Sequence, residues 1–142
     1  MTMKMESTTP PSPDRDAARQ RLSGLRDVLL KLHKTLVDSE RVSYEKTVGQ
    51  IPSPNHFLKL LMSDPWFAWL QPLSQLIIAM DIALEEKEPL TMPGVDALVK
   101  QTGQLLVAAE GAPGFPGHYN AALQRDPEVV MAHAEVAKML KN

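Results

Sequence analysis

The feature that most constrains the fold is a long stretch without proline, residues 14–48. Leucines recur along it three or four residues apart, at Leu22, Leu25, Leu29, Leu32 and Leu36. This spacing predicts one α-helix with a single apolar stripe. At about 1.5 Å per residue the helix would be roughly 50 Å long, longer than a compact domain of this size is wide. We therefore expect it to protrude, to pack against a second copy, or to bend or change its packing partner near Ser39 and Ser43, where serine replaces leucine.

Proline and capping residues divide the rest of the chain into shorter helices. Ser53-Pro54, Asp64-Pro65 and Asp126-Pro127 are each an N-cap followed by a proline at the first helical position. The predicted helices cover residues 54–62, 65–87 with a kink or restart at Pro72, 93–110, 118–125 and 127–140. No segment alternates with period two, so we expect no sheet.

The fold class that follows is all-α, a single-domain bundle of five to six helices with a long first helix, covering residues 14–142. Residues 1–13 are rich in Ser, Thr and Pro and have no apolar face, which predicts a disordered tail. Its deletion should leave thermal stability unchanged.

Composition and charge disfavour several classes of function. The chain has 142 residues, 44% of them hydrophobic, and no cysteine, which excludes disulfides and thiolate metal sites. Its 15 basic and 17 acidic residues give a net charge of -2, so no global field attracts nucleic acid or an anionic membrane. The longest apolar run, Leu76 to Leu84, is interrupted by Asp81 and is too short to span a bilayer. Because residues 1–13 lack an apolar segment typical of a secretory signal, we expect a cytoplasmic protein. From the balanced charge and the short apolar run, we expect that it binds neither nucleic acid nor membrane.

Motifs for chemistry are missing from the sequence. There is no GxSxG, no P-loop and no GxGxxG, and the four histidines, His33, His56, His118 and His133, form no pair at metal-ligand spacing. We predict no catalytic, cofactor or metal site and favour binding over enzymatic chemistry. A site assembled from residues distant in sequence is invisible to this reasoning.

Two helices carry apolar residues outside their main stripes. Ile78 and Ile82 lie nearly opposite the stripe of Leu73, Leu76, Ile77, Met80 and Leu84. Leu30, Val37 and Tyr44 repeat every seven residues beside the leucine stripe, a spacing typical of extended helix-helix contacts. These five residues, Leu30, Val37, Tyr44, Ile78 and Ile82, either widen the core face within one chain or form the interface of a homodimer or partner complex.

The two tryptophans mark a second candidate site. Helical spacing places Trp66 and Trp69 near the side of Leu73, where they could line a pocket for a small apolar or aromatic ligand. The alternative is that they anchor a kinked helix in the core, the commonest use of aromatic side chains.

Two stretches, Ser63 to Ser74 and His118 to Pro127, followed by Ala132 to Val136, resemble small bacterial all-helical proteins of uncharacterised function over the last two thirds of the chain. The resemblance implies a bacterial, cytoplasmic protein and identifies no site. The sequence as a whole favours a non-enzymatic interaction or regulatory protein that acts through protein contacts and self-associates. The alternative is a helical bundle that binds a small apolar or aromatic ligand.

Overall fold

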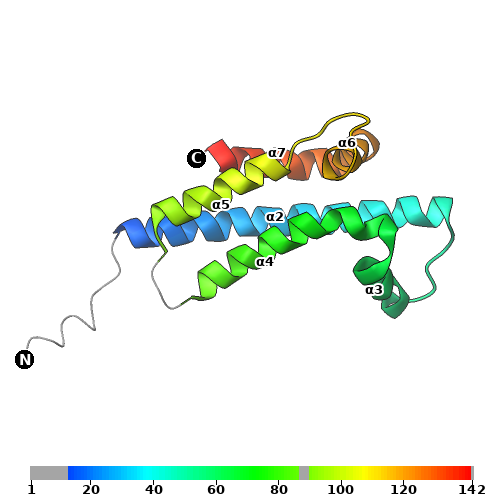
Figure 1. Ribbon diagram of the computed structural model, residues 1–142, viewed down its shortest axis with the longest axis horizontal. Coiled ribbons are helices and arrows are strands. Elements are labelled where there is room, and N and C mark those ends of the chain that lie inside the picture. Colours follow the sequence, from blue (N-terminus) through cyan, green and yellow to red (C-terminus); the bar gives the residue numbers. More distant parts are fainter. Residues whose placement is uncertain (1–12, 87–89, 142) are drawn as a thin grey trace, which may run out of the picture.

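The computed structural model describes residues 13–86 and 90–141, and within them it contains helices and no strand (Figure 1). The prediction of an all-α bundle of five to six helices with a long first helix is confirmed. The elements are α2 (Pro13–Thr47), α3 (Pro54–Ser63), the 3-10 helix η1 (Pro65–Leu70), α4 (Gln71–Glu85), α5 (Met92–Leu105), α6 (Phe115–Arg125) and α7 (Pro127–Lys141).

Helix α2 is the central element and runs the length of the molecule (Figure 1). It packs mainly against α7 and α4 and also contacts α5. Arg26 pairs with Asp81 on α4, and Lys31 pairs with Glu135 on α7. The helix stays uninterrupted to Thr47, so its last turns project beyond α4 and α7 (Figure 1), which is one of the alternatives expected from the length of the leucine segment.

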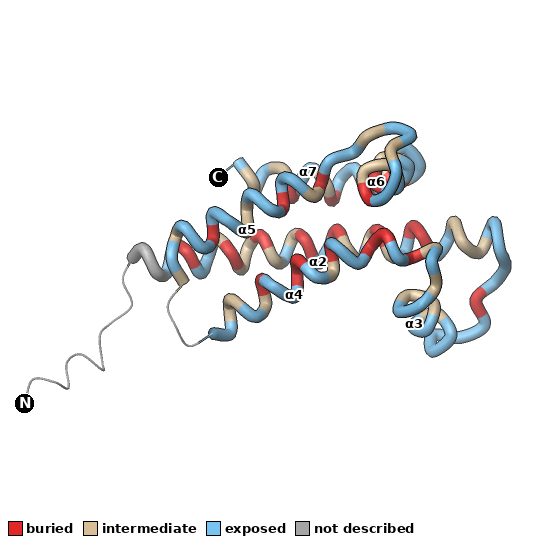
Figure 2. The backbone as a smooth tube through the Cα atoms, in the orientation of Figure 1, coloured by how far each residue is buried: buried red, intermediate tan, exposed pale blue. Residues whose placement is uncertain are grey.

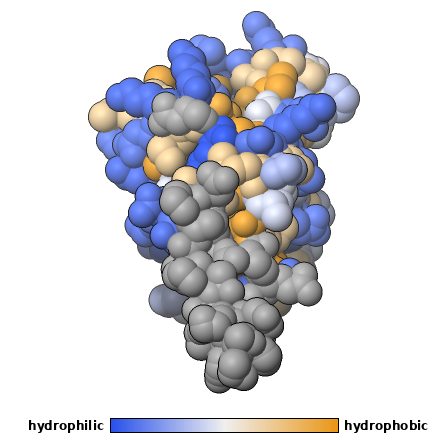
Figure 3. All heavy atoms as spheres, turned by 90° about the vertical axis from the view of Figure 1, so that its left-hand side faces the viewer, coloured by the Kyte–Doolittle hydropathy of each residue, from blue (hydrophilic) through white to orange (hydrophobic). Residues whose placement is uncertain are grey.

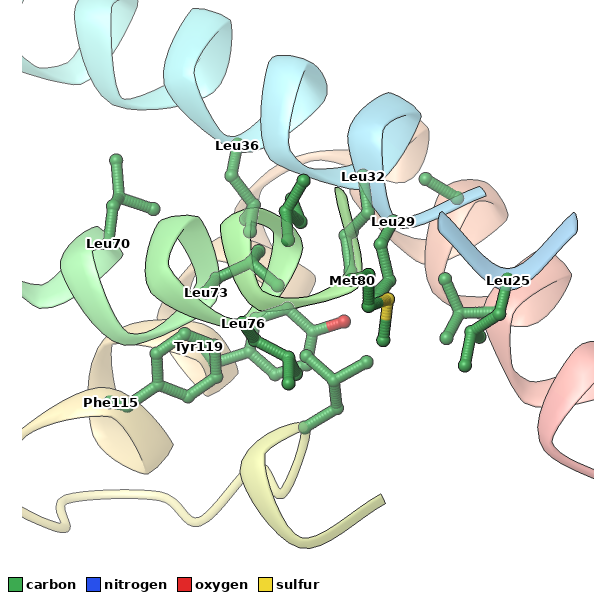
Figure 4. Close-up of a cluster of buried hydrophobic side chains, with 14 of the residues drawn as sticks. Leu25, Leu29, Leu32, Leu36, Leu70, Leu73, Leu76, Met80, Phe115 and Tyr119 are labelled. Carbon is green, nitrogen blue, oxygen red and sulfur yellow. The ribbon is translucent and has the colours of Figure 1, made fainter. Parts of the chain in front are cut away.

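The leucine stripe of α2 forms the centre of the core. All five stripe leucines are buried, and Figure 2 shows the buried positions recurring along the side of α2 that faces the other helices. Figure 4 shows several of these leucines beside Leu73 and Met80 of α4 and Phe115 and Tyr119 of α6. Complete burial of one such side chain stabilises the fold by about 1.5–3 kcal/mol, so this contact is the main source of stability.

The predicted caps form at all three sites. The side chains of Ser53, Asp64 and Asp126 accept hydrogen bonds from the backbone N–H of His56, Trp66 and Glu128 at 3.1, 2.8 and 2.9 Å. These bonds satisfy N–H groups that a helix start leaves unpaired.

The predicted restart at Pro72 also forms, because η1 ends where α4 begins. Pro72 has no N–H to donate to the carbonyl of Ala68, and Gln71 donates to that oxygen instead. The chain therefore takes the tighter 3-10 geometry before α4.

Two helix boundaries differ from the prediction. The helix predicted over 93–110 ends at Leu105, and the helix predicted from His118 begins at Phe115. The chain must turn back between them so that Phe115 can pack against Trp69, with ring centroids 5.3 Å apart. Gly117 permits this close turn, because a Cβ there would lie 1.8 Å from the carbonyl oxygen of Ala112.

Helix α2 begins at Pro13, and residues 1–12 of the predicted tail lie outside the described residues, as do residues 87–89, into which the helix predicted over 65–87 was expected to run. Pro65–Glu85 is one helical stretch of 21 residues that is long and apolar enough to cross a membrane by length and composition alone. The prediction that the longest apolar stretch is too short to span a bilayer considered only Leu76 to Leu84. The helical stretch is longer than that run because η1 and α4 join end to end. Its inner side chains, including Leu73 and Met80, pack in the core against α2.

Candidate functional site

Two polar contacts hold α4 against α2. The Arg26 guanidinium donates to a carboxylate oxygen of Asp81 at 2.7 Å, and the His33 ring nitrogen Nε2 lies 2.8 Å from the Ser74 hydroxyl. From the first contact to the second, the residue number rises by seven on α2 and falls by seven on α4. The helices are therefore antiparallel and in register over at least two turns.

Large apolar side chains lie beside these two contacts and remain open to solvent. Leu30, between Arg26 and His33 on α2, is 42% exposed, while Ile78 and Ile82 on α4 are 55% and 57% exposed. Because Ile78 lies between Ser74 and Asp81, the register places it at the level of Leu30 along the two helices. We call Leu30, Ile78 and Ile82 the α2–α4 apolar face.

The other two residues of the predicted interface are used within the chain. Val37 and Tyr44 are partly buried and pack against the core. Tyr44 makes an edge-to-face contact with Trp66, with ring centroids 5.5 Å apart, and also lies beside Phe67. The seven-residue repeat of Leu30, Val37 and Tyr44 therefore reflects helix packing, but only Leu30 contributes to an exposed apolar surface.

A different surface of the molecule shows the ordinary arrangement. At the end of the bundle seen in Figure 3, hydrophobic side chains lie in small groups among hydrophilic ones, outside the area drawn in grey. Scattered apolar side chains of this kind are normal on protein surfaces. The α2–α4 apolar face differs because its three members lie at the level of one helix contact, on helices held by an ion pair and a hydrogen bond.

The three residues of the predicted ligand pocket separate in the structure. Trp66 is half-buried and lines a cavity of about 260 Å³ together with Glu40, His118 and Arg125. Trp69 is buried and stacks on His118 at 5.4 Å, and Leu73 is completely buried in the core. Both indole N–H groups are covered and have no hydrogen-bond partner among the described residues. The tryptophans thus anchor η1, and only one of them borders a cavity.

A buried ion pair joins the far half of α2 to the end of α6. Arg125 donates to a Glu40 carboxylate oxygen at 2.7 Å and, through Nε and Nη2, to the Ser39 hydroxyl at 3.2 and 3.0 Å. The Glu40 side chain is only 8% exposed, whereas that of Arg125 is 35% exposed. This is the change of packing partner predicted near Ser39: polar contacts with α6 replace leucine packing.

Next to this ion pair, an open groove runs between α2 and the junction of α6 and α7. It consists of two adjoining cavities of about 250 and 260 Å³ that share Ser39, Val42 and Asp126. We call it the α2–α7 groove. Its first cavity is also lined by Asp38 and Glu128, and its second by Lys46 and Arg125.

The charges in the α2–α7 groove are arranged unusually for this molecule. Along the leucine half of α2, charges of opposite sign meet across the helix contacts, as in the pairs of Arg21 with Asp96 and Lys31 with Glu135. In the groove, Asp38 and Glu128 line one cavity from opposite walls, and Lys46 and Arg125 line the other, which Asp126 also borders. Part of each like-charge repulsion is offset within the chain, since Asp38 pairs with Lys34 and Arg125 pairs with Glu40.

Sequence reasoning missed the residues of this groove for a physical reason. Arg125 lies 85 residues from Glu40, and no local pattern links them. One signal was present: Asp38, Val42 and Lys46 are spaced four residues apart and therefore share a face of α2. Nothing in the sequence indicated which element faces that row.

Two partly buried histidines and a buried tyrosine have shifted pKa values. Burial lowers the pKa of His33 and of His133, and it raises the pKa of Tyr119. The Tyr119 hydroxyl lies 2.6 Å from Nδ1 of His133, and Tyr119 is completely buried. This hydrogen bond stabilises the contact of α6 with α7.

No protein-family model, characterised protein or solved structure matches this chain in the three comparisons made. The resemblance to small bacterial all-helical proteins stays a prediction.

Proposed function

We propose that this protein is a non-enzymatic helical interaction protein that self-associates through the α2–α4 apolar face. The observation that supports this most directly is the exposure of Leu30, Ile78 and Ile82 at one helix contact. Adjacent apolar side chains on a rigid surface are typical of protein interaction sites, in contrast to single exposed ones. The ion pair of Arg26 with Asp81 fixes the surface on which they stand.

A second copy of the chain is the partner that the charges favour. A two-fold axis between Ile78 and Ile82 makes α4 antiparallel to its copy, so that each Ile78 faces an Ile82. Glu85 and Glu86 of the copy then reach the level of Ser74, where Lys34 of α2 is strongly exposed. The acidic end of one α4 would therefore meet a lysine of the other chain, which is a self-complementary arrangement.

The expected dimer is weak, because the apolar face is small. Burial of a half-exposed isoleucine or leucine contributes about 1 kcal/mol, and six such side chains meet across the two-fold axis. Much of this gain offsets the loss of translational and rotational freedom on association. We expect a dissociation constant between about 1 µM and about 1 mM.

Sedimentation equilibrium over a concentration series tests this proposal. The unmutated protein should show a monomer-dimer equilibrium, and Ile78→Glu with Ile82→Glu should be a folded monomer with an unchanged helical circular dichroism spectrum. The matched control is Leu58→Glu with Met62→Glu, since these α3 residues are also four apart and more than half exposed. The control should dimerise like the unmutated protein.

Charge reversal distinguishes the proposed geometry from other modes of association. Lys34→Glu should weaken the dimer, and adding Glu85→Lys and Glu86→Lys should restore it. A strict monomer at every concentration would contradict self-association. A dimer that is lost in the α3 variant and kept in the α4 variant would place the interface elsewhere.

The apolar-ligand function predicted from the sequence has less support. The cavity beside Trp66 is bordered by the ion pair of Glu40 with Arg125, and neither Trp69 nor Leu73 lines it.

A further inference from the structure

We infer that the α2–α7 groove binds a small zwitterion whose ammonium and carboxylate groups are about 10 Å apart, of the size of a free tripeptide. The ammonium group would lie in the acidic cavity and the carboxylate in the basic one. This site lies on a different face of α2 from the α2–α4 apolar face, and it does not depend on self-association.

The first argument is the row of side chains on α2. Asp38, Val42 and Lys46 are spaced four residues apart, so an acidic, an apolar and a basic side chain follow one another along one helix face. Asp38 and Lys46 are eight residues apart, which is about 12 Å along the helix axis. A fully extended tripeptide spans roughly 10 Å, and its termini carry the opposite charges.

The second argument is that the opposite wall repeats the same polarity. Glu128 of α7 lines the acidic cavity with Asp38, and Arg125 of α6 lines the basic cavity with Lys46. A bound ammonium group would separate the two carboxylates, and a bound carboxylate would separate the two cations. The ligand ammonium would attract Asp38 and Glu128, and its carboxylate would attract Lys46 and Arg125.

The third argument is the hydrogen-bonding capacity left in the groove. Arg125 uses Nε and Nη2 for Ser39 and Glu40, and its Nη1 has no partner within the part of the chain that the structure describes. Lys46 makes no ion pair among those residues, although Asp38 pairs with Lys34 at 3.4 Å. A ligand carboxylate can accept from both free cationic groups.

The middle of the groove is suited to a small apolar side chain. Val42 is about half exposed and lines both cavities, together with Ser39 and Asp126. One oxygen of the Asp126 carboxylate already accepts the Glu128 backbone N–H as the cap of α7. A central valine or alanine of the ligand would lie on Val42 and leave that cap in place.

Calorimetric titration with four forms of one peptide tests the site. The peptide is Ala-Val-Ala with free ends, with an acetylated amino end, with an amidated carboxyl end, and with both modifications. The free form should bind most tightly, each modification should weaken binding about tenfold, and the doubly modified form should not bind measurably. Binding of the free form should also weaken as salt is raised.

Two conservative variants assign each end of the peptide. Lys46→Gln should weaken the free peptide about as much as amidation does and have no further effect on the amidated peptide. Asp38→Asn should show the same relation to acetylation. Lys100→Gln, which removes an exposed lysine from α5, is the control and should change nothing.

These variants keep the proposal falsifiable because both replaced side chains are exposed, so their replacement should leave the fold intact. Unchanged circular dichroism will show that the variants are folded. Equal binding of all four peptides, or no binding of the free peptide at millimolar concentration, would overturn the proposal. The proposal would also be overturned if Lys46→Gln weakened the binding of only those peptides that have a free amino end.

Discussion

The two halves of α2 differ in how they contact the rest of the protein. From Ala18 to Leu36 the inner face is apolar and completely buried, and charged side chains at its edges pair with opposite charges on α4, α5 and α7. From Asp38 to Lys46 the same helix contacts α6 through a buried ion pair and borders an open groove. One continuous helix therefore carries the buried leucine stripe in one half and borders an open groove with the other.

The largest expected difference between the two halves comes from removing one buried side chain of the leucine half. Leu32→Ala should lower the free energy of unfolding by about 3 kcal/mol, because Leu32 is completely buried and the core cannot fill the cavity. Val42→Ala in the other half should change it by less than about 0.5 kcal/mol. Urea denaturation of both variants measures the difference, and similar losses would show that the two halves contribute equally.

A smaller effect is expected from the ion pair of the groove half. Arg125→Met should cost about 2 kcal/mol, because it leaves the Glu40 carboxylate buried without its cation while partial exposure admits some water. The double variant Glu40→Leu with Arg125→Met should regain most of that loss, since no unpaired charge remains. If the double variant is less stable than the single one, the pair itself stabilises the fold and our interpretation of it is wrong.

The smallest effect concerns pH and the leucine half. Burial lowers the pKa of His33 in the folded protein, so below the ordinary histidine pKa of about 6.5 the unfolded chain binds more protons than the folded one. Stability should therefore fall as the pH is lowered from 7 to 5. His33→Gln, which keeps a donor for Ser74, should reduce this fall, and the remaining part should come from His133. Thermal denaturation across this pH range measures both, and an unchanged slope in the variant would contradict the assignment.

Local patterns predicted the helices and most of their boundaries. The leucine spacing on α2 and the caps at Ser53, Asp64 and Asp126 depend on residues that are close in sequence, so the sequence alone was enough. The end of α5 was wrong because the turn that follows it depends on Phe115 reaching Trp69, a contact between distant segments.

The candidate surfaces were predicted less completely. The pattern on α4 identified Ile78 and Ile82 as lying off the core stripe, and the seven-residue repeat identified Leu30. It could not distinguish Leu30, which stays exposed, from Val37 and Tyr44, because all three lie on the same side of α2 and only the position of neighbouring elements decides which are covered.

The sequence by itself determined that this chain is helical and that its longest helix carries one apolar stripe, because both properties follow from spacing along one segment. Only the tertiary structure decided that Arg125 meets Glu40, that Lys46 and Arg125 line one end of the α2–α7 groove, and that Leu30 stays exposed. Those arrangements depend on the register between helices, and register is set by the packing of whole faces against one another.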